Sequence, residues 1–239
     1  MLEIPGLGPK KARKIWQELE ITTVGELEYA CQENRLIDLD GFGAKTQDKI
    51  LEGIQFIKQY QESHLISDVM EPAVPLLHFI KNHDKVIRAE LAGSLRRHYE
   101  TVKDIDIVAS VANDDRDAVM DDFVGRPNVT DVIGKGETKS SVRLENGINA
   151  DLRLVSDVQF PYALHHFTGS KEHNTAMRAM AKSRGVKMNE YALFQGDDLV
   201  KCQTEHDIFD ALDLDYIPPE LRENTGEIEY AASDTSPEL

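Results

Sequence analysis

Two aspartates separated by one residue are the side chains of this 239-residue sequence that most clearly suggest chemistry. Asp104 and Asp106 open an apolar run that continues to Val111 and is typical of a buried β-strand. Because residues i and i+2 of a strand point to the same face, the two carboxylates converge. Neighbouring carboxylates repel each other unless a cation lies between them, and hard oxygen ligands suit Mg²⁺. The pair predicts a magnesium site.

A third carboxylate, Asp151, lies on a segment that alternates polar and apolar residues from 148 to 154. Asn146-Gly147 precedes it and predicts a hairpin turn from the alternating segment 141–144. If the strand of Asp151 pairs beside that of Asp104, three carboxylates meet, enough to hold two metal ions for an in-line phosphoryl displacement. For an isolated Asp-x-Asp, a solvated strand end is the alternative explanation.

Groups that suit a polyphosphate stand shortly before the aspartates. Gly93 and Ser94 precede a predicted helix and would offer backbone N–H groups and a hydroxyl, and Arg97 would add a guanidinium. The combination of these groups with the carboxylates points to a nucleoside triphosphate.

A Gly-apolar-Gly motif occurs twice near the N-terminus, at Gly6-Leu7-Gly8 and at Gly41-Phe42-Gly43, with a spacing of 35 residues. Each copy leads into a helical stretch, whose free N–H groups suit a phosphate. The lysines in or beside the first turns oppose the helix dipole, so helix stability does not explain them, whereas an anion does; they are Lys10, Lys11 and Lys45. The alternative is a pair of ordinary helix-turn-helix units packing a helical core.

The spacing of apolar residues divides the rest of the chain into predicted helices and strands. Residues 60–90 read as helix, with a break marked by Pro72 and Pro75, and residues 171–184 read as helix again. Residues 188–200 suggest a short strand pair. The prediction is an α+β fold in which an all-helical module precedes a mixed body.

Composition limits the class of protein. No apolar run approaches the roughly 18 residues that a membrane span needs, no secretory signal opens the sequence, and two cysteines are too few for a disulfide framework. We therefore expect a soluble, cytoplasmic protein. The net charge of −16 is concentrated in residues 197–239, which carry 13 acidic and two basic side chains, so weak binding to DNA is still compatible with it.

These motifs together resemble family X of the DNA polymerases (polymerase beta-like), in the bacterial form, over nearly the whole chain. Gly93-Ser94 with Arg97, Asp104-x-Asp106 and Asp151 match the nucleotidyltransferase palm. Further matches are Lys135-Gly136-Glu137-Thr138-Lys139 in the palm, Phe167-Thr168-Gly169-Ser170 with Asn174 and Arg178 at the incoming nucleotide, and Asn189-Glu190-Tyr191 in the thumb. The resemblance divides the chain into a helix-hairpin-helix module (1–60), a palm (61–156), a small α/β thumb that binds nucleotide (157–226) and a solvated linker (227–239).

The resemblance implies roles for these residues. The three aspartates would be catalytic and would hold two Mg²⁺ ions, with Mn²⁺ as a substitute. Nucleotide would be bound by Gly93, Ser94, Arg97, His166, Phe167, Gly169, Asn174 and Arg178. DNA would be bound by Gly6, Gly8, Lys10, Lys11, Gly41, Gly43, Lys45, Lys135 and Lys139. Carbonyls of Leu2, Ile4 and Leu7 would bind a monovalent cation.

The sequence departs from the family pattern at two positions and in extent. His166 stands where the family usually has tyrosine, and Asn149 stands where an arginine usually supports the third carboxylate. The N-terminal lyase domain and the C-terminal phosphoesterase-type domain of bacterial members are missing, so we expect a fragment with fingers, palm and thumb.

The function implied is Mg²⁺-dependent nucleotidyl transfer from a dNTP to a primer 3′-hydroxyl in short-gap DNA repair. Its partners would be gapped or primer-template DNA and dNTP, with no membrane and no obligate protein partner. Two alternatives are a DNA-binding fragment with little catalysis of its own and a nucleotidyltransferase that acts on another acceptor. His165, His166 and His173 offer a further alternative, a zinc cluster.

Overall fold

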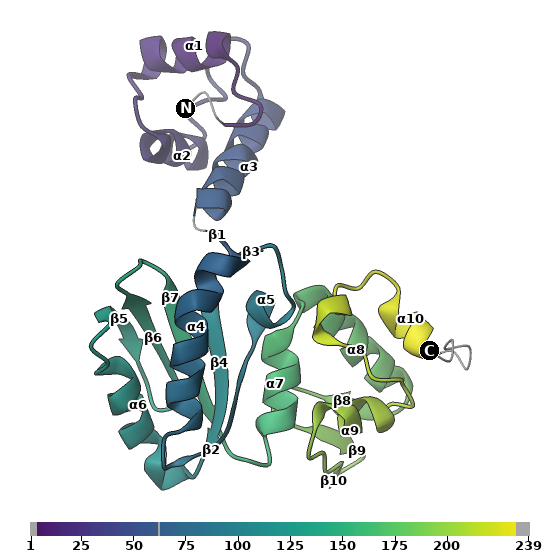
Figure 1. Cartoon of the computed structure of the whole chain (residues 1–239). Helices are drawn as coiled ribbons and strands as arrows, with labels where there is room; N and C mark the ends of the chain where they lie inside the picture. The colour runs from purple at the N-terminus through teal and green to yellow at the C-terminus, as the bar shows by residue number, and fades with distance from the viewer. Residues whose placement is uncertain (1–3, 62, 233–239) are drawn as a thin grey trace. The chain divides into compact units, whose positions relative to one another are not determined.

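The computed structural model describes residues 4–61 and 63–232 (Figure 1). The chain forms two compact units, residues 1–63 and residues 64–239. The division falls close to the boundary predicted at residue 60. The predicted palm and thumb lie together in the second unit.

The first unit is all-helical, as predicted. Its helices are α1 (Pro9–Leu19), α2 (Val24–Gln32) and α3 (Ala44–Gln61). Thr23 caps α2 in a reciprocal capping box with Glu26, and Gly8 with Pro9 opens α1. The three helices enclose one apolar core that includes Ile15, Leu27, Leu36, Ile50 and Ile54, all fully buried.

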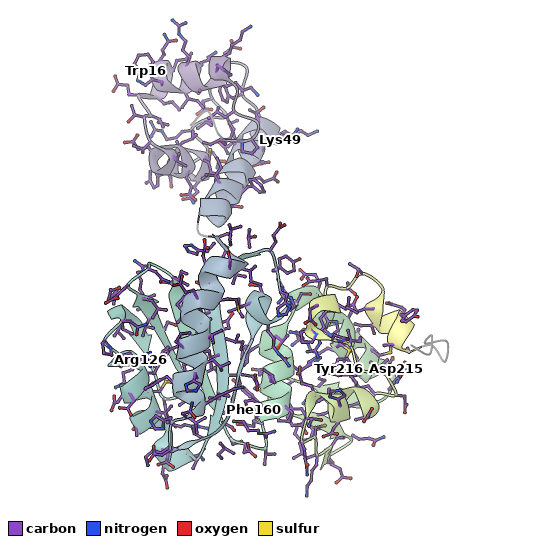
Figure 2. All side chains as sticks on the ribbon, viewed as in Figure 1. Trp16, Lys49, Arg126, Phe160, Asp215 and Tyr216 are labelled. Carbon is purple, nitrogen blue, oxygen red and sulfur yellow. The ribbon has the colours of Figure 1, made fainter. Side chains whose placement is uncertain are left out.

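Trp16 does not share that core, although it stands in the helical stretch that follows the first glycine motif. Its side chain is 55% exposed on the outside of α1, whereas its neighbour Ile15 is buried (Figure 2). Adjacent side chains of a helix point about 100° apart, and on α1 it is Ile15 that faces the core while Trp16 points away from it.

A five-stranded mixed sheet organises the second unit. Its order is β2-β4-β7-β6-β5, and only β4 and β7 are parallel. The strands are β2 (Val86–Leu91), β4 (Asp104–Val111), β5 (Val129–Lys135), β6 (Lys139–Leu144) and β7 (Asn149–Val155). A separate pair joins β1 (His64–Leu65) to β3 (Thr101–Val102). The strands expected at 141–144 and 148–154, with their turn at Gly147, are confirmed.

Helices cover both faces of this sheet. α4 (Ile66–Lys81) and α6 (Arg116–Val124) pack on one face, where Ile105, Ile107 and Leu152 are buried with them. α7 (Phe160–Thr168) packs on the other face, where Phe160 and Val108 belong to one buried cluster. Figure 2 labels Phe160. The short α5 (Gly93–Arg96) follows β2, and a 3-10 turn (Asn113–Asp115) precedes α6.

The break predicted at Pro72 and Pro75 is wrong. α4 continues through both prolines, because Val69, Ala73 and Leu76 pack one face of the helix into the core of the sheet. This packing outweighs the hydrogen bonds that the prolines cannot donate.

The last part of the unit surrounds a smaller core built on α8 (Lys171–Ser183). Its other elements are β8 (Val186–Met188), β9 (Leu193–Gln195), β10 (Asp198–Leu199), α9 (Glu205–Asp210), a 3-10 turn (Pro219–Leu221) and α10 (Glu227–Ala231). The helix expected at 171–184 and the strand pair expected at 188–200 are confirmed, and β9 turns into β10 at Gly196 and Asp197.

The linker predicted at 227–239 is wrong for its first residues. Residues 227–231 form α10, which buries Ile228 and Ala231 in the smaller core, and apolar burial therefore outweighs the polar composition that suggested a solvated segment. Residues 233–239 lie outside the described residues. The predicted α+β fold is confirmed. In the described part of the chain, no helix has both the length and the apolar character that crossing a membrane requires.

Candidate active site

The three predicted carboxylates come from adjacent parallel strands. Asp106 of β4 pairs in register with Asp151 of β7, and Asp104 pairs with Asn149. The alternation of each strand places these side chains on one face of the sheet. Burial, followed by the charges of Asp151 and Asp104, raises the pKa of Asp106 to about 7. The predicted pairing of the two strands is confirmed. It brings the carboxylates of Asp104, Asp106 and Asp151 close enough to repel one another.

The turn at Gly93 closes tightly over this point. Gly93 has φ +62°, and a Cβ added there would lie 2.2 Å from Oδ2 of Asp106. The Ala92 N–H donates to the Asp106 carbonyl oxygen at 2.8 Å, which ties the turn to β4. Only glycine fits both the left-handed backbone and the space beside the carboxylate. The fold thus brings the predicted phosphate-binding turn against the predicted metal ligands.

Two cations face the carboxylates from the same side of the sheet. Lys139 Nζ lies 2.6 Å from Oδ2 of Asp151, and the guanidinium carbon of Arg153 lies 3.9 Å from the centre of the Phe167 ring. Their charges oppose the rise in the pKa of Asp106. Sequence reasoning placed Lys139 on DNA and missed its contact with Asp151.

The donor set suits a hard divalent cation, because it consists of carboxylate oxygens that repel one another. The side chains as described are not yet arranged as ligands: among residues 4–61 and 63–232, no group of three or more His, Cys, Asp or Glu is gathered closely enough to hold a metal ion. The residue types therefore fit Mg²⁺, while Asp151 is engaged by an ammonium.

Arg97 and Gly169, both predicted at the nucleotide, lie close together. Arg97 Nη1 donates to the Thr168 carbonyl at 2.6 Å, and a Cβ added to Gly169 would lie 3.0 Å from that nitrogen. Arg97 Nε also donates to Glu223 at 2.6 Å. These two contacts use two of the five N–H donors of the Arg97 guanidinium and fix its position beside Gly169. Ser94 lies in α5, directly after Gly93.

The remaining residues predicted at the nucleotide lie on α7 and α8. His166 meets Phe167 edge to face at 4.8 Å, and burial lowers the pKa of His166 while nearby Glu190 opposes the shift. Asn174 is buried, and its amide donates to the His166 carbonyl at 2.7 Å. Arg178 is exposed and donates to the Asn174 carbonyl at 3.2 Å. The contact with His166 uses the amide nitrogen of Asn174, whereas its Oδ1 has no hydrogen-bond partner within the described residues.

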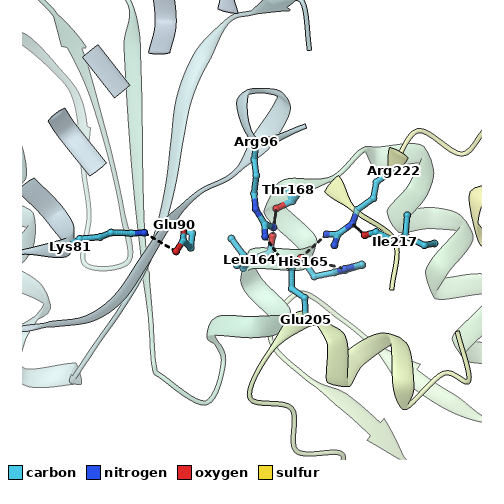
Figure 3. A network of polar contacts seen from close by, with 9 residues as sticks. All are labelled: Lys81, Glu90, Arg96, Leu164, His165, Thr168, Glu205, Ile217 and Arg222. Carbon is cyan, nitrogen blue, oxygen red and sulfur yellow. Dashed lines mark hydrogen bonds and ion pairs between the residues drawn. The ribbon is translucent and has the colours of Figure 1, made fainter. Parts of the chain in front are cut away.

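A buried ion network, which sequence reasoning missed, supports the turn after α7 (Figure 3). Glu205 accepts from Arg96 at 2.5 Å and from the fully buried Arg222 at 2.6 Å. Arg96 also donates to Thr168 Oγ1 at 2.7 Å, which links α5 to the end of α7. Burial opposes ionisation of Glu205, but the contacts with Arg96 and Arg222 hold its pKa below the ordinary value. Arg96, Glu205 and Arg222 are far apart in the sequence and belong to no sequence motif.

The zinc reading is not supported by the described residues. The rings of His165 and His173 lie 5.6 Å apart, and His173 contacts Glu227 at 2.8 Å, but no metal-binding group of three or more residues is found in the described chain. Burial lowers the pKa of both histidines, so both are neutral at pH 7.

The predicted DNA-binding motifs of the first unit form matched turns. Gly6 and Gly41 have φ of +86° and +81°, and Gly8 and Gly43 accept the first helical hydrogen bonds of α1 and α3. A surface hollow is lined by residues of the first turn and its lysines, namely Gly6, Gly8, Pro9, Lys10 and Lys11. Lys45 is exposed in the first turn of α3. The geometry leaves backbone and lysine groups accessible to an anion.

The remaining predictions concern Lys135 as a DNA contact and the carbonyls that would bind a monovalent cation. In the second unit, Lys135 forms an ion pair with Asp121 of α6. Of the carbonyls predicted to bind a monovalent cation, that of Ile4 accepts from the Leu7 N–H at 3.0 Å, and Leu2 lies outside the described residues.

Comparison with known proteins identifies the class of both parts. Residues 163–223 match the sequence family of the DNA polymerase beta thumb, and residues 1–55 match the SAM-like helix-hairpin-helix tandem. A crystal structure of Leishmania infantum polymerase beta in a ternary P/T complex shares the fold, with a TM-score of 0.60 over 92% of this chain and 95% of that chain at 23% identity.

Among curated relatives, the DNA polymerase/3′-5′ exonuclease PolX of Bacillus subtilis is 37% identical over 233 residues, which cover 96% of this chain and 40% of that protein. Rat DNA polymerase lambda is 25% identical over 92% of this chain and 48% of its own length. The repair DNA polymerase X of African swine fever virus is 30% identical over 54% of this chain and 78% of its own length. This chain belongs to family X of the DNA polymerases, and it spans less than half the length of the bacterial and rat relatives.

Proposed function

We propose that this chain is a DNA-directed DNA polymerase that transfers a nucleotidyl group from a dNTP to the 3′-hydroxyl of a primer in short gaps of DNA. The observation that carries the proposal is the in-register pairing of Asp106 with Asp151, beside Asp104 and under the Gly93 turn. A cation bound between these carboxylates would relieve their repulsion and could also bind a phosphate at the glycine turn. The parallel strands hold the carboxylates in a fixed arrangement for this.

The carboxylates would position the reacting groups. Asp104 and Asp106 would hold both metal ions, and Asp151 would complete the catalytic site and orient the primer hydroxyl. When bound, Mg²⁺, or Mn²⁺ in its place, would supply positive charge to the transferring phosphoryl group and acidify the hydroxyl. The raised pKa of Asp106 supports this assignment, because the carboxylate is held where its ionised form needs a neighbouring cation.

The nucleotide would lie between α5 and α8. Backbone N–H groups of the Gly93 turn, the Ser94 hydroxyl and Arg97 would contact the triphosphate, with Arg97 exchanging its contact with Glu223 for phosphate. Phe167 and His166 would pack against the sugar. A histidine is smaller than the tyrosine usual in the family, so discrimination between ribose and deoxyribose would be weaker.

Gapped or primer-template DNA would be the partner. The two glycine turns of the first unit would bind backbone phosphates without reading sequence, and Lys135 and Lys139 would add contacts from the palm. A monovalent cation at Ile4 and Leu7 would strengthen the first turn. A cytoplasmic location belongs to the same proposal.

Single-turnover insertion on a duplex with a one-nucleotide gap tests the proposal. The wild-type chain should extend the primer with Mg²⁺ and not with EDTA. Asp151→Asn should lower the insertion rate by roughly 100-fold or more, because the metal site loses a charged ligand and the primer hydroxyl loses the group that orients it. Asp131→Asn, on the exposed β5, is the matched control and should insert at the wild-type rate.

The other candidate functions give different outcomes. Gap-dependent DNA binding without insertion would indicate a binding fragment, and transfer to an RNA or a small molecule would indicate another acceptor. Wild-type insertion by a folded Asp151→Asn chain would refute the assignment of the carboxylates.

A further inference from the structure

Lys139 occupies an unusual position for a residue expected on DNA. It opens β6, and its ammonium lies 2.6 Å from Oδ2 of Asp151, the carboxylate assigned to the primer hydroxyl. A contact of this length is a direct, charge-assisted hydrogen bond. In this arrangement the ammonium takes a position beside Asp151 that a divalent cation would otherwise use.

Strand register explains why Lys139 points to Asp151. In the antiparallel pair β6–β7, Lys139 stands opposite Arg153, and Ser141 stands opposite Asp151. Arg153 carries the same charge as Lys139 and stacks on Phe167. The ammonium therefore turns away from its direct partner to the diagonal neighbour, a distance that a long side chain can span.

Both side chains of this contact are partly exposed to solvent. The side chains of Lys139 and Asp151 are 44% and 25% exposed. Ion pairs with such exposure contribute little to stability, since water and salt screen them. The pair can open at low cost, and a phosphate can draw the ammonium away.

We propose that Lys139 exchanges its ammonium between Asp151 and a backbone phosphate of bound DNA, so that DNA binding frees Asp151 for a divalent cation. The proposal rests on the function proposed above. By thermodynamic linkage, DNA raises the affinity for the cation by the same factor as the cation raises the affinity for DNA. From an exposed ion pair we expect a factor of about five. Lys139 is then a positioning residue that orders the assembly of the site.

Binding of Mn²⁺ to the full chain tests the coupling without catalysis. Free Mn²⁺ is counted by electron paramagnetic resonance, with and without a saturating gapped duplex and in the absence of nucleotide. The signal of duplex alone is subtracted, and binding that Asp151→Asn abolishes defines the site. The variant is Lys139→Gln. The control is Lys81→Gln, because the Lys81 side chain has a similar exposure of 41% but pairs with Glu90 at 2.8 Å instead and is assigned to neither the carboxylates nor DNA.

For the wild type and for Lys81→Gln we expect the affinity for Mn²⁺ to rise about fivefold when DNA is added. Lys139→Gln should bind Mn²⁺ about fivefold more tightly without DNA, and DNA should add no further gain. Thermal melting confirms that the variants are folded.

A DNA-dependent gain that persists in Lys139→Gln would overturn the proposal, and so would identical behaviour of the two lysine variants. If the wild type fills gaps with Mg²⁺ while the coupling is absent, only the role of Lys139 fails. If no Asp151-dependent Mn²⁺ binding occurs even with DNA, the proposed function fails with it.

Discussion

Replacement of Asp106 by asparagine should stabilise the metal-free protein at neutral and alkaline pH. In the folded chain burial and the charges of Asp151 and Asp104 raise the pKa of Asp106 from 3.8 to about 7. The folded state therefore binds a proton that the unfolded state has released, and stability falls as the pH rises from about 4 to about 7. Asparagine keeps the shape of the side chain and removes this penalty.

The structure sets the size of the effect. A pKa increase from 3.8 to about 7 corresponds to an upper limit of about 4 kcal/mol for ionising Asp106 in the folded state. Relaxation and water penetration reduce such energies, so we expect about 2 kcal/mol at pH 8. For a protein of this size that is a rise of roughly 4–8 °C in Tm. The difference should shrink towards pH 5, where much of the penalty is absent.

Differential scanning calorimetry in EDTA at pH 5 and pH 8 measures this difference. Trp16 is the only tryptophan and lies in the first unit, so its fluorescence reports the unfolding of residues 1–63 separately and should be the same in both proteins. Asp131→Asn, an exposed carboxylate of the same sheet, is the control. Added Mg²⁺ should then raise the Tm of the wild type more than that of Asp106→Asn.

An Asp106→Asn protein that melts at or below the wild-type temperature at pH 8 would refute the reasoning. It would mean that the carboxylate is already neutralised by its surroundings. A gain that is equal at pH 5 and pH 8 would also refute it, because the effect would then be one of packing and not of charge.

Three other changes have definite expected results. Gly93→Ala should destabilise the chain by about 2 kcal/mol and abolish primer insertion, because its Cβ would meet the Asp106 carboxylate; a variant with wild-type melting and insertion would contradict the tight turn. Glu205→Gln should lower the free energy of unfolding, measured by urea denaturation, by about 3 kcal/mol, because the charge of the buried Arg222 is then uncompensated. A decrease below 1 kcal/mol would show that the ion pair is not needed for stability. Lys10→Gln should reduce the salt slope of DNA binding by about one, measured by titration at several salt concentrations, and an unchanged slope would remove Lys10 from the interface.

Local patterns in the sequence were enough to predict the elements that carry the site. Alternation with a period of two indicated that Asp104 and Asp106 share a face, and Asn146-Gly147 indicated the hairpin that ends in β7. Repeated glycines indicated the two turns of the first unit. Each of these features depends on residues within a few positions of one another, so the sequence contains the necessary information.

Local patterns failed where packing over long distances decided the outcome. Pro72 and Pro75 suggested a break, but packing against the core of the sheet keeps α4 continuous through both residues. A polar composition suggested a linker at residue 227, but Ile228 is buried in the smaller core. In both places burial of apolar surface outweighed the local preference.

The order of the amino acids is enough to show which residues carry charge and which face of its strand each one occupies. Which charges meet depends on the folded chain: Asp106 lies beside Asp151 through a parallel pairing, Lys139 reaches Asp151 across a diagonal, and Glu205 meets Arg222 in a buried network. Electrostatic interaction depends on separation in space and on the surrounding dielectric, neither of which follows from spacing along the chain. The family's motif residues could therefore be found in the sequence, whereas the contact of Lys139 with Asp151 could be found only in the folded structure.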